Sequence, residues 1–79
     1  MFGNDPSTAI TTIVADTNGN HWYVDSRLTF DHGLETMVFP CDSNGNVTSW
    51  IDRYAEWHND VNQMRERHTE IVSHIEKYI

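Results

Sequence analysis

The chain has 79 residues, and twelve acidic against five basic side chains give it a net charge of −7. This length allows one small domain, and the 38% hydrophobic content supports a single thin core. The acidic balance argues against direct binding to nucleic acid or to an anionic membrane, because both are negatively charged and attract cations.

Three strands are expected in the first half of the chain. Residues 1–7 contain Gly, Asn, Asp and Pro and are expected to form a flexible arm, which leaves residues 8–79 as a single domain. The stretch Thr8–Ala15 is rich in Ile, Thr and Val and predicts a strand. His21–Phe30 alternates apolar and polar residues and predicts a half-buried strand, and Leu34–Pro40 predicts a third. The buried face of the second strand is expected to consist of Trp22, Val24, Leu28 and Phe30, with Ser26 between them.

The pattern Asp-x-Asn-Gly-Asn occurs twice, at residues 16–20 and 42–46. Asn-Gly favours a hairpin turn of type I′, in which both residues take a positive φ. A calcium loop of the EF-hand type explains the pattern less well, because that loop needs Gly at its sixth position and Glu at its twelfth. Here Gly is fourth, and the twelfth residues are the cations Arg27 and Arg53. Both segments are therefore predicted to be hairpin turns.

Apolar residues recur at three- and four-residue steps through the last third of the chain and predict an amphipathic helix. Periodicity alone would allow one helix over residues 49–79, above a sheet of three strands. The middle of this region contains several poor helix formers, however, and Asp60 followed by Gln63 is typical of a helix N-terminus. We therefore favour a strand at about residues 53–58 and a helix at about residues 60–78.

These elements predict an α+β fold, in which a small antiparallel sheet of three to four strands is covered on one face by a single C-terminal amphipathic helix. The opposite face of the sheet is expected to be acidic, because eight of the twelve acids but only two of the five bases precede residue 60. The helix is expected to cover the sheet with Val61, Met64, Ile71, Val72 and Ile75.

The stretch Glu35-Thr-Met-Val-Phe-Pro-Cys-Asp-Ser-Asn-Gly-Asn-Val-Thr-Ser-Trp50 resembles a block found in small uncharacterised proteins of phages and prophages. The likeness covers roughly residues 22–72, with an aromatic strand at Tyr54–His58 and a helix that carries His68-Thr-Glu-Ile-Val72. The chain departs from the pattern at the start of the helix, where the phage proteins have a Thr-Glu-Glu-Glu-Ala run. The resemblance implies a phage or prophage origin and carries no biochemical activity.

No residue pattern in the chain indicates a metal site, a cofactor or catalysis. Five histidines and Cys41 are candidate ligands, but none shows the spacing of an HExxH or CxxC motif. His68 falls on the apolar stripe of the helix and is expected to be a core histidine bonded to a backbone carbonyl. The carboxylate of Asp42 opposes thiolate formation at Cys41. We therefore expect no metal, no cofactor and no enzyme activity, since a nucleophile paired with a base is not apparent.

Two tryptophans are the residues that a small core explains least well. Trp50 and Trp57 lie close in sequence to Asp52 and Glu56, and Glu35 could lie across the sheet from them. Exposed tryptophan ringed by carboxylates suits a basic, partly apolar protein surface. These five residues form the candidate binding site.

The function expected from these observations is that of a non-catalytic phage or prophage accessory protein that binds and modulates a host protein. A nucleic-acid-handling target such as a defence nuclease fits the acidity, because carboxylates can occupy a site made for phosphates. The expected location is the cytoplasm of the bacterial host, since the chain shows neither signal peptide nor membrane span. Two alternatives stay open: a self-assembling module, including a homodimer, and a protein that sequesters a small ligand or nucleotide.

Overall fold

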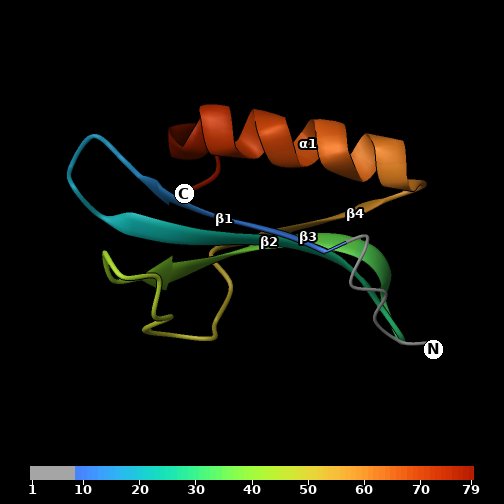
Figure 1. Ribbon diagram of the computed structural model, residues 1–79, viewed down its shortest axis with the longest axis horizontal. Helices are drawn as coiled ribbons and strands as arrows, with labels where there is room; N and C mark the ends of the chain where they lie inside the picture. Colours follow the sequence, from blue (N-terminus) through green and yellow to red (C-terminus); the bar gives the residue numbers. More distant parts are fainter. Residues whose placement is uncertain (1–8) are drawn as a thin grey trace.

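The computed structural model describes residues 9–79, so the arm predicted over residues 1–7 lies outside the described residues. Four antiparallel strands form one sheet in the order β1-β2-β3-β4, each paired with its neighbour in sequence (Figure 1). The elements are β1 (Ile10–Ala15), β2 (His21–Thr29), β3 (Gly33–Cys41), β4 (Tyr54–His58), α1 (Val61–Ser73) and the 3₁₀ turn η2 (Ile75–Lys77). This is the predicted α+β fold, with four strands.

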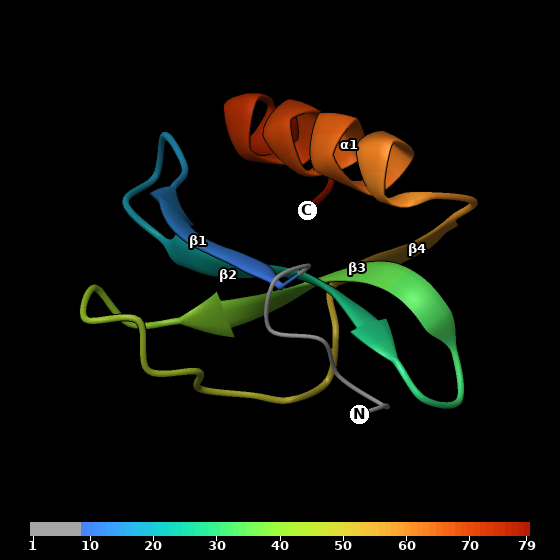
Figure 2. The same ribbon diagram turned by 45° about the vertical axis from the view of Figure 1, so that its right-hand side comes forward.

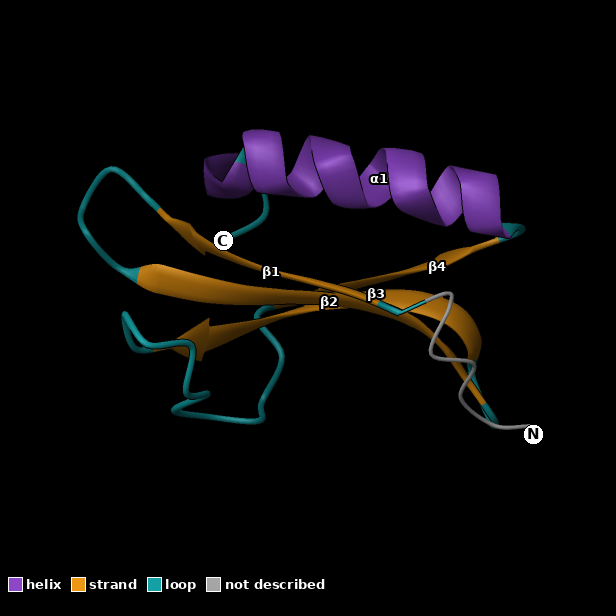
Figure 3. Ribbon diagram, in the orientation of Figure 1, coloured by secondary structure: helices purple, strands orange, loops and turns teal. Residues whose placement is uncertain are grey.

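Helix α1 lies across one face of the sheet, which we call the inner face (Figure 3). The loop between β3 and β4 lies on the opposite side, the outer face, and the turned view shows the same two sides (Figure 2). Strand alternation sends Trp22, Val24 and Val38 to the inner face, where they pack with Ile71 and Ile75 of the C-terminal region. This single apolar layer between the sheet and the helix is the core.

The chain breaks between β4 and α1 where the sequence predicted a break. Asp60 is the N-cap of α1, and its carboxylate accepts a hydrogen bond from the backbone N–H of Gln63 at 2.8 Å. The Gln63 amide oxygen accepts a bond from the N–H of Asn59 at 2.7 Å. The helix ends at Ser73 rather than near residue 78, because the chain tightens into η2 after His74. No helix in the described part of the chain is long and apolar enough to cross a membrane.

Both Asp-x-Asn-Gly-Asn segments form turns, but the predicted type I′ geometry is wrong. Only the glycines, Gly19 and Gly45, take a positive φ in these turns. The N–H of Gly19 donates to the carbonyl of Asp16 at 3.1 Å, and the Asp16 carboxylate accepts bonds from two further N–H groups of the turn. Residues 42–46 repeat these bonds. Each turn is therefore a type I turn followed by a left-handed glycine, with the Asp side chain holding the backbone.

Phe30 is the predicted core residue that the structure places elsewhere. It is 86% exposed at the tip of the β2–β3 turn. The second strand ends one position earlier, where Thr29 pairs with Gly33, so strand alternation no longer directs the Phe30 side chain to the inner face.

Candidate functional site

A chain of hydrogen-bonded polar side chains crosses the inner face beneath α1. Thr12 lies 2.8 Å from Nε2 of His68, and Nδ1 of the same ring lies 2.7 Å from the hydroxyl of Ser26. Ser26 bonds to Thr36, which lies 2.8 Å from Nε2 of His58. Each of the four strands supplies one residue of this chain, and the helix supplies His68. These hydrogen bonds, which we call the polar chain, therefore connect the four strands and α1.

One placement of the hydroxyl and imidazole protons gives every hydrogen bond of the polar chain a donor and an acceptor. Nδ1 of His58 faces a carboxylate oxygen of Glu56 at 3.6 Å, which favours the ring proton at that nitrogen. Thr36 then donates to Nε2 of His58, and Ser26 donates to Thr36. Nδ1 of His68 then donates to the hydroxyl of Ser26, so that all these bonds run in the same direction. Both rings are neutral in this arrangement, and each of the two central hydroxyls donates once and accepts once.

Burial keeps the two histidines neutral. The side chain of His58 is 1% exposed and His68 is 4% exposed. Removal from water lowers the pKa of each ring, and the opposing effects of Glu56 on His58 and of Asp25 on His68 are smaller. His68 is thus a core histidine as predicted, but hydroxyl groups bind it in place of a backbone carbonyl. Because Ser26 is fully buried, this Ser–His pair offers no nucleophile to a substrate.

Glu56 also belongs to the inner face. Its carboxylate accepts two bonds from Arg67 of α1, at 2.8 and 2.9 Å, and one from the hydroxyl of Tyr54 at 2.6 Å. The bonds from Arg67 are the main reason that the pKa of Glu56 is lowered. Trp57, the next residue along β4, points to the outer face because strand side chains alternate. The structure therefore separates Glu56 from the tryptophan beside it in sequence.

The outer face carries a groove of about 350 Å³, lined at one end by three aromatic side chains and along its length by Asp25, Arg27 and Glu35. Trp50 reaches back from the β3–β4 loop and packs edge-on against Phe39, with ring centroids 5.0 Å apart. Tyr23 completes the cluster, 6.3 Å from the ring of Trp50. Trp50 is 69% exposed although it helps to bury Phe39, so most of its indole remains available for contact. Met37 and Glu35 continue the groove along β3.

Glu35 is a charged group of this groove that has no counter-ion in the described part of the chain. It is only 7% exposed, yet its carboxylate forms no hydrogen bond or ion pair with any group of residues 9–79. Arg27 stands directly opposite on β2, but its guanidinium binds Asp25 at 2.7 Å twice. On the other side, Trp57 stands directly opposite Glu35 and is 58% exposed. A carboxylate placed between an indole and a groove can bind an incoming cation.

The five predicted binding residues thus divide between the two faces. Glu35, Trp50 and Trp57 lie on the outer face, Asp52 is exposed in the β3–β4 loop, and Glu56 lies on the inner face. Beside Asp52 in this loop, Ile51 is 81% exposed. The outer face was predicted to be acidic, but it combines aromatic side chains with both acidic and basic ones, Asp25, Arg27 and Glu35. The reason is that most acids lie in turns or, like Glu56, point inward.

Metal ligation and the reactivity of Cys41 are two further possibilities for the described residues. Within residues 9–79 no group of three or more His, Cys, Asp or Glu side chains is placed to hold a metal ion. Cys41 is buried, and its burial, followed by the charge of Asp42, raises the pKa of its thiol.

No protein-family model, curated protein or solved structure matches the chain. The resemblance to phage and prophage proteins stays a prediction. Inference about function therefore depends on the geometry of the two faces of the sheet.

Two features of the sheet, the buried hydrogen bonds of Ser26 and the pair of Asp25 and Arg27, were not predicted although the sequence contains signals for both. Ser26 stands at an inward position between Val24 and Leu28, and a polar residue on an apolar face requires a buried partner. Asp25 and Arg27 are two positions apart on one strand and therefore share a face, where they neutralise each other. That pairing occupies Arg27, the cation that stands directly opposite Glu35.

Proposed function

We propose that this chain is a non-catalytic phage or prophage accessory protein, which binds and modulates a bacterial host protein through the outer face of its sheet. The observation that carries the proposal is the position of Glu35, a residue that is 7% exposed, has no counter-ion within residues 9–79 and lies between the exposed Trp57 and the outer-face groove. The phage origin is supported by the sequence resemblance alone.

The chemistry of this face favours an arginine-bearing surface of the partner. A guanidinium could bind the Glu35 carboxylate with paired hydrogen bonds while its plane stacks on an indole. Trp57 and Trp50 would supply apolar contact area around that ion pair, and tryptophan and arginine are the residues most often found at the energetic centre of interfaces. The net charge of −7 would attract a basic partner before contact. Proteins that handle nucleic acid carry such basic surfaces, which makes them the proposed class of target.

A direct test uses arginine itself as the ligand. Titration with N-acetyl-arginine amide should shift the indole N–H signals of Trp50 and Trp57 in an NMR spectrum. The indole of Trp22 is an internal control, because it is buried and donates to Asp16 at 3.0 Å. The uncharged isostere N-acetyl-citrulline amide should produce little shift. Equal shifts with both ligands would show that no cation site exists at Glu35.

A second test examines binding to a protein. Tagged wild-type chain should enrich a specific basic protein from bacterial lysate at low salt and lose it at high salt. Glu35→Gln and Trp57→Ala should each lose that protein. Glu66→Gln is the matched control, because it removes the same charge from an exposed position on α1. Capture that is equal for Glu35→Gln and Glu66→Gln would contradict the proposal.

A further inference from the structure

Strand β1 forms one edge of the sheet and lacks the features that usually protect an edge. Within residues 9–79 only β2 pairs with it. Its sequence, Ile-Thr-Thr-Ile-Val-Ala, contains no charge and no proline and consists almost entirely of β-branched residues. Proteins commonly place lysine, proline or a bulge at such an edge to prevent pairing with another chain.

The register shows which backbone groups of β1 point away from β2. The N–H of Asp16 donates to the carbonyl of Asn20 at 2.8 Å, and hydrogen-bonded pairs alternate along an antiparallel ladder. Val14 and Thr12 therefore bond to β2, like every second residue before Asp16. The backbone N–H and C=O groups of Thr11, Ile13 and Ala15 point outward, where an added strand could bind them.

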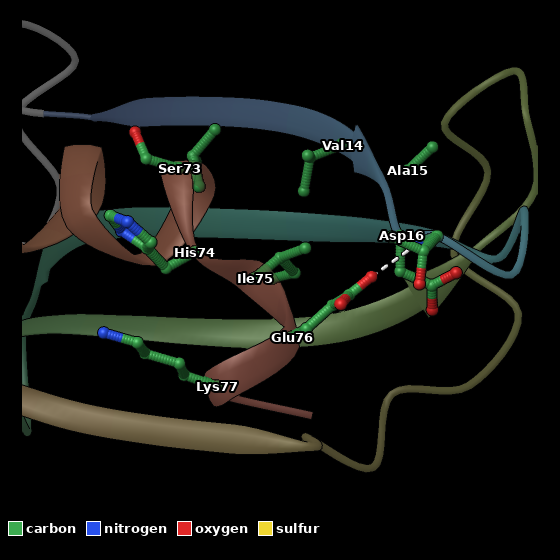
Figure 4. A pocket seen from close by; sticks show the side chains of 10 residues that line it. Val14, Ala15, Asp16, Ser73, His74, Ile75, Glu76 and Lys77 are labelled. Atoms are coloured by element: carbon green, nitrogen blue, oxygen red, sulfur yellow. Dashed lines mark hydrogen bonds between the residues drawn. The ribbon is translucent and has the colours of Figure 1, made fainter.

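A groove of about 580 Å³ lies next to this edge, on the helix side of the sheet (Figure 4). Val14 of β1, Val72 of α1 and Ile75 of η2 give it an apolar lining. The backbone N–H of Thr17 donates to the carboxylate of Glu76 at 2.6 Å, which ties the β1–β2 turn to η2 at the groove. A strand added to β1 would place alternate side chains on this side of the sheet, within reach of the groove.

We infer that the edge of β1 pairs antiparallel with β1 of a second copy of this chain, so that two sheets join into one across a two-fold axis. With the axis at Ile13, each outward-pointing residue meets an outward-pointing partner: Ile13 meets itself, and Thr11 meets Ala15 of the second copy. Ile13 is 39% exposed on the outer face, and this pairing buries it against its own counterpart. Ile10 of the second copy then lies opposite Asp16 on the helix side, beside the apolar groove.

Charge and symmetry favour a second copy as the occupant. Two chains of net charge −7 repel each other, and the uncharged β1 edge lets them approach without opposing like charges directly. Antiparallel pairing of identical strands is closed by a two-fold axis, so that the β1 edges of both copies are used in one contact. Salt should therefore strengthen this contact, because it screens the repulsion between the chains. The proposed binding of a basic partner has the opposite salt dependence.

Analytical ultracentrifugation of the full chain from low to high micromolar concentration tests the inference. Wild type should form a dimer, and Ile13→Lys should weaken it by at least about tenfold, because the axis brings the two lysines together. Ala15→Pro should also weaken it by removing an outward N–H that β2 does not need. Ile51→Lys, the same change at an exposed loop position, should dimerise like wild type. Circular dichroism confirms that each variant is folded.

Amide hydrogen exchange locates the contact. Protection of Thr11, Ile13 and Ala15 should rise with protein concentration, whereas Thr12 and Val14 should be protected at every concentration. A wild-type chain that stays monomeric at high micromolar concentration in high salt would overturn the inference, and so would a dimer that Ile13→Lys leaves intact. Ile13→Lys should still capture the host protein, and Glu35→Gln should still dimerise, so the two proposals fail separately.

Discussion

The two faces of the sheet differ in how completely their charged side chains are paired. Within residues 9–79 no buried polar side-chain atom on either face lacks a hydrogen-bond partner, and on the inner face these partners include the polar chain and the pair of Glu56 and Arg67. On the outer face Glu35 has no counter-ion within residues 9–79, and Trp50 and Trp57 remain largely exposed. The inner face is therefore organised for stability. The outer face carries the Glu35 carboxylate and two exposed indoles, and the proposed binding depends on these groups.

Neighbouring residues on single strands show this contrast most directly. In β4, Glu56 binds Arg67 and Tyr54 on the inner face, while Trp57 is exposed on the outer face. In β3, Thr36 is fully buried in the polar chain, while Glu35 beside it faces the groove. Substitutions one position apart should therefore have different consequences for stability and for binding.

The largest expected effect comes from the apolar layer of the inner face. Ile71→Ala removes a fully buried side chain that packs with Trp22, Val24 and Val38, and it should lower the free energy of unfolding by about 2–5 kcal/mol. In a domain of this size such a loss leaves the chain close to unfolded.

Urea denaturation of Ile71→Ala beside Ile51→Ala measures this difference. The second variant makes the same chemical change at an 81% exposed position and should alter stability by less than about 0.5 kcal/mol. If the two variants were equally destabilised, the loop that carries Trp50 and Ile51 would be part of the folding core.

The pH dependence of the free energy of unfolding tests whether the two histidines of the polar chain are neutral in the folded protein. Burial lowers the pKa of His58 and His68 below the ordinary value of 6.5, so the unfolded chain binds more protons than the folded one just below that pH. The free energy of unfolding should be nearly constant between about pH 7 and 8 and should fall as the pH decreases below about 6.5. The pKa values of Asp16, Asp42 and Glu56 are lowered, so these carboxylates reduce the free energy of unfolding further only below about pH 4.5.

The variant His68→Gln identifies the source of this pH dependence. Glutamine can still accept and donate hydrogen bonds toward Ser26 and Thr12, but it cannot take up a proton. Urea midpoints measured between pH 7 and 5 should therefore change less steeply for His68→Gln than for wild type. Parallel pH curves for the two proteins would mean that His68 does not titrate on unfolding.

Patterns confined to one stretch of chain predicted the fold well. The alternation in β2, the two Asp-x-Asn-Gly-Asn turns and the cap formed by Asp60 and Gln63 each depend on residues close in sequence. The predicted turn type and the predicted burial of Phe30 were wrong. Both depend on which residue pair is the last one in the strand ladder. One position there decides the direction of a side chain.

The candidate site could be predicted only in part, because it depends on strand register. Trp57 was expected near Glu35, and the register places the two residues directly opposite each other. The position of Glu56 on the inner face follows from the same register and from Arg67, which is eleven positions away in the chain. The polar chain joins Thr12 to His68, which are fifty-six positions apart. Partners at such separations leave no local pattern in the sequence.

The smallest expected effect gives the sharpest comparison of the two faces, because one substitution is made on each. Glu56→Gln removes the charge that Arg67 binds and weakens three hydrogen bonds of the inner face. It should lower the free energy of unfolding by about 1–2 kcal/mol, a value reduced from that of a fully buried pair because Arg67 is 35% exposed. Glu35→Gln removes a carboxylate that has no counter-ion within residues 9–79, so it should leave stability unchanged or raise it by up to about 1 kcal/mol.

The two variants have the same net charge and can be compared in one set of urea titrations. A loss of stability in Glu35→Gln equal to that in Glu56→Gln would mean that Glu35 has a structural role, and the contrast between the faces would disappear. Stability that is kept or raised, together with loss of the arginine-dependent shift at Trp57, would show that the charge of Glu35 serves binding at no benefit to folding. A residue of that kind is expected where a surface has been selected for a partner.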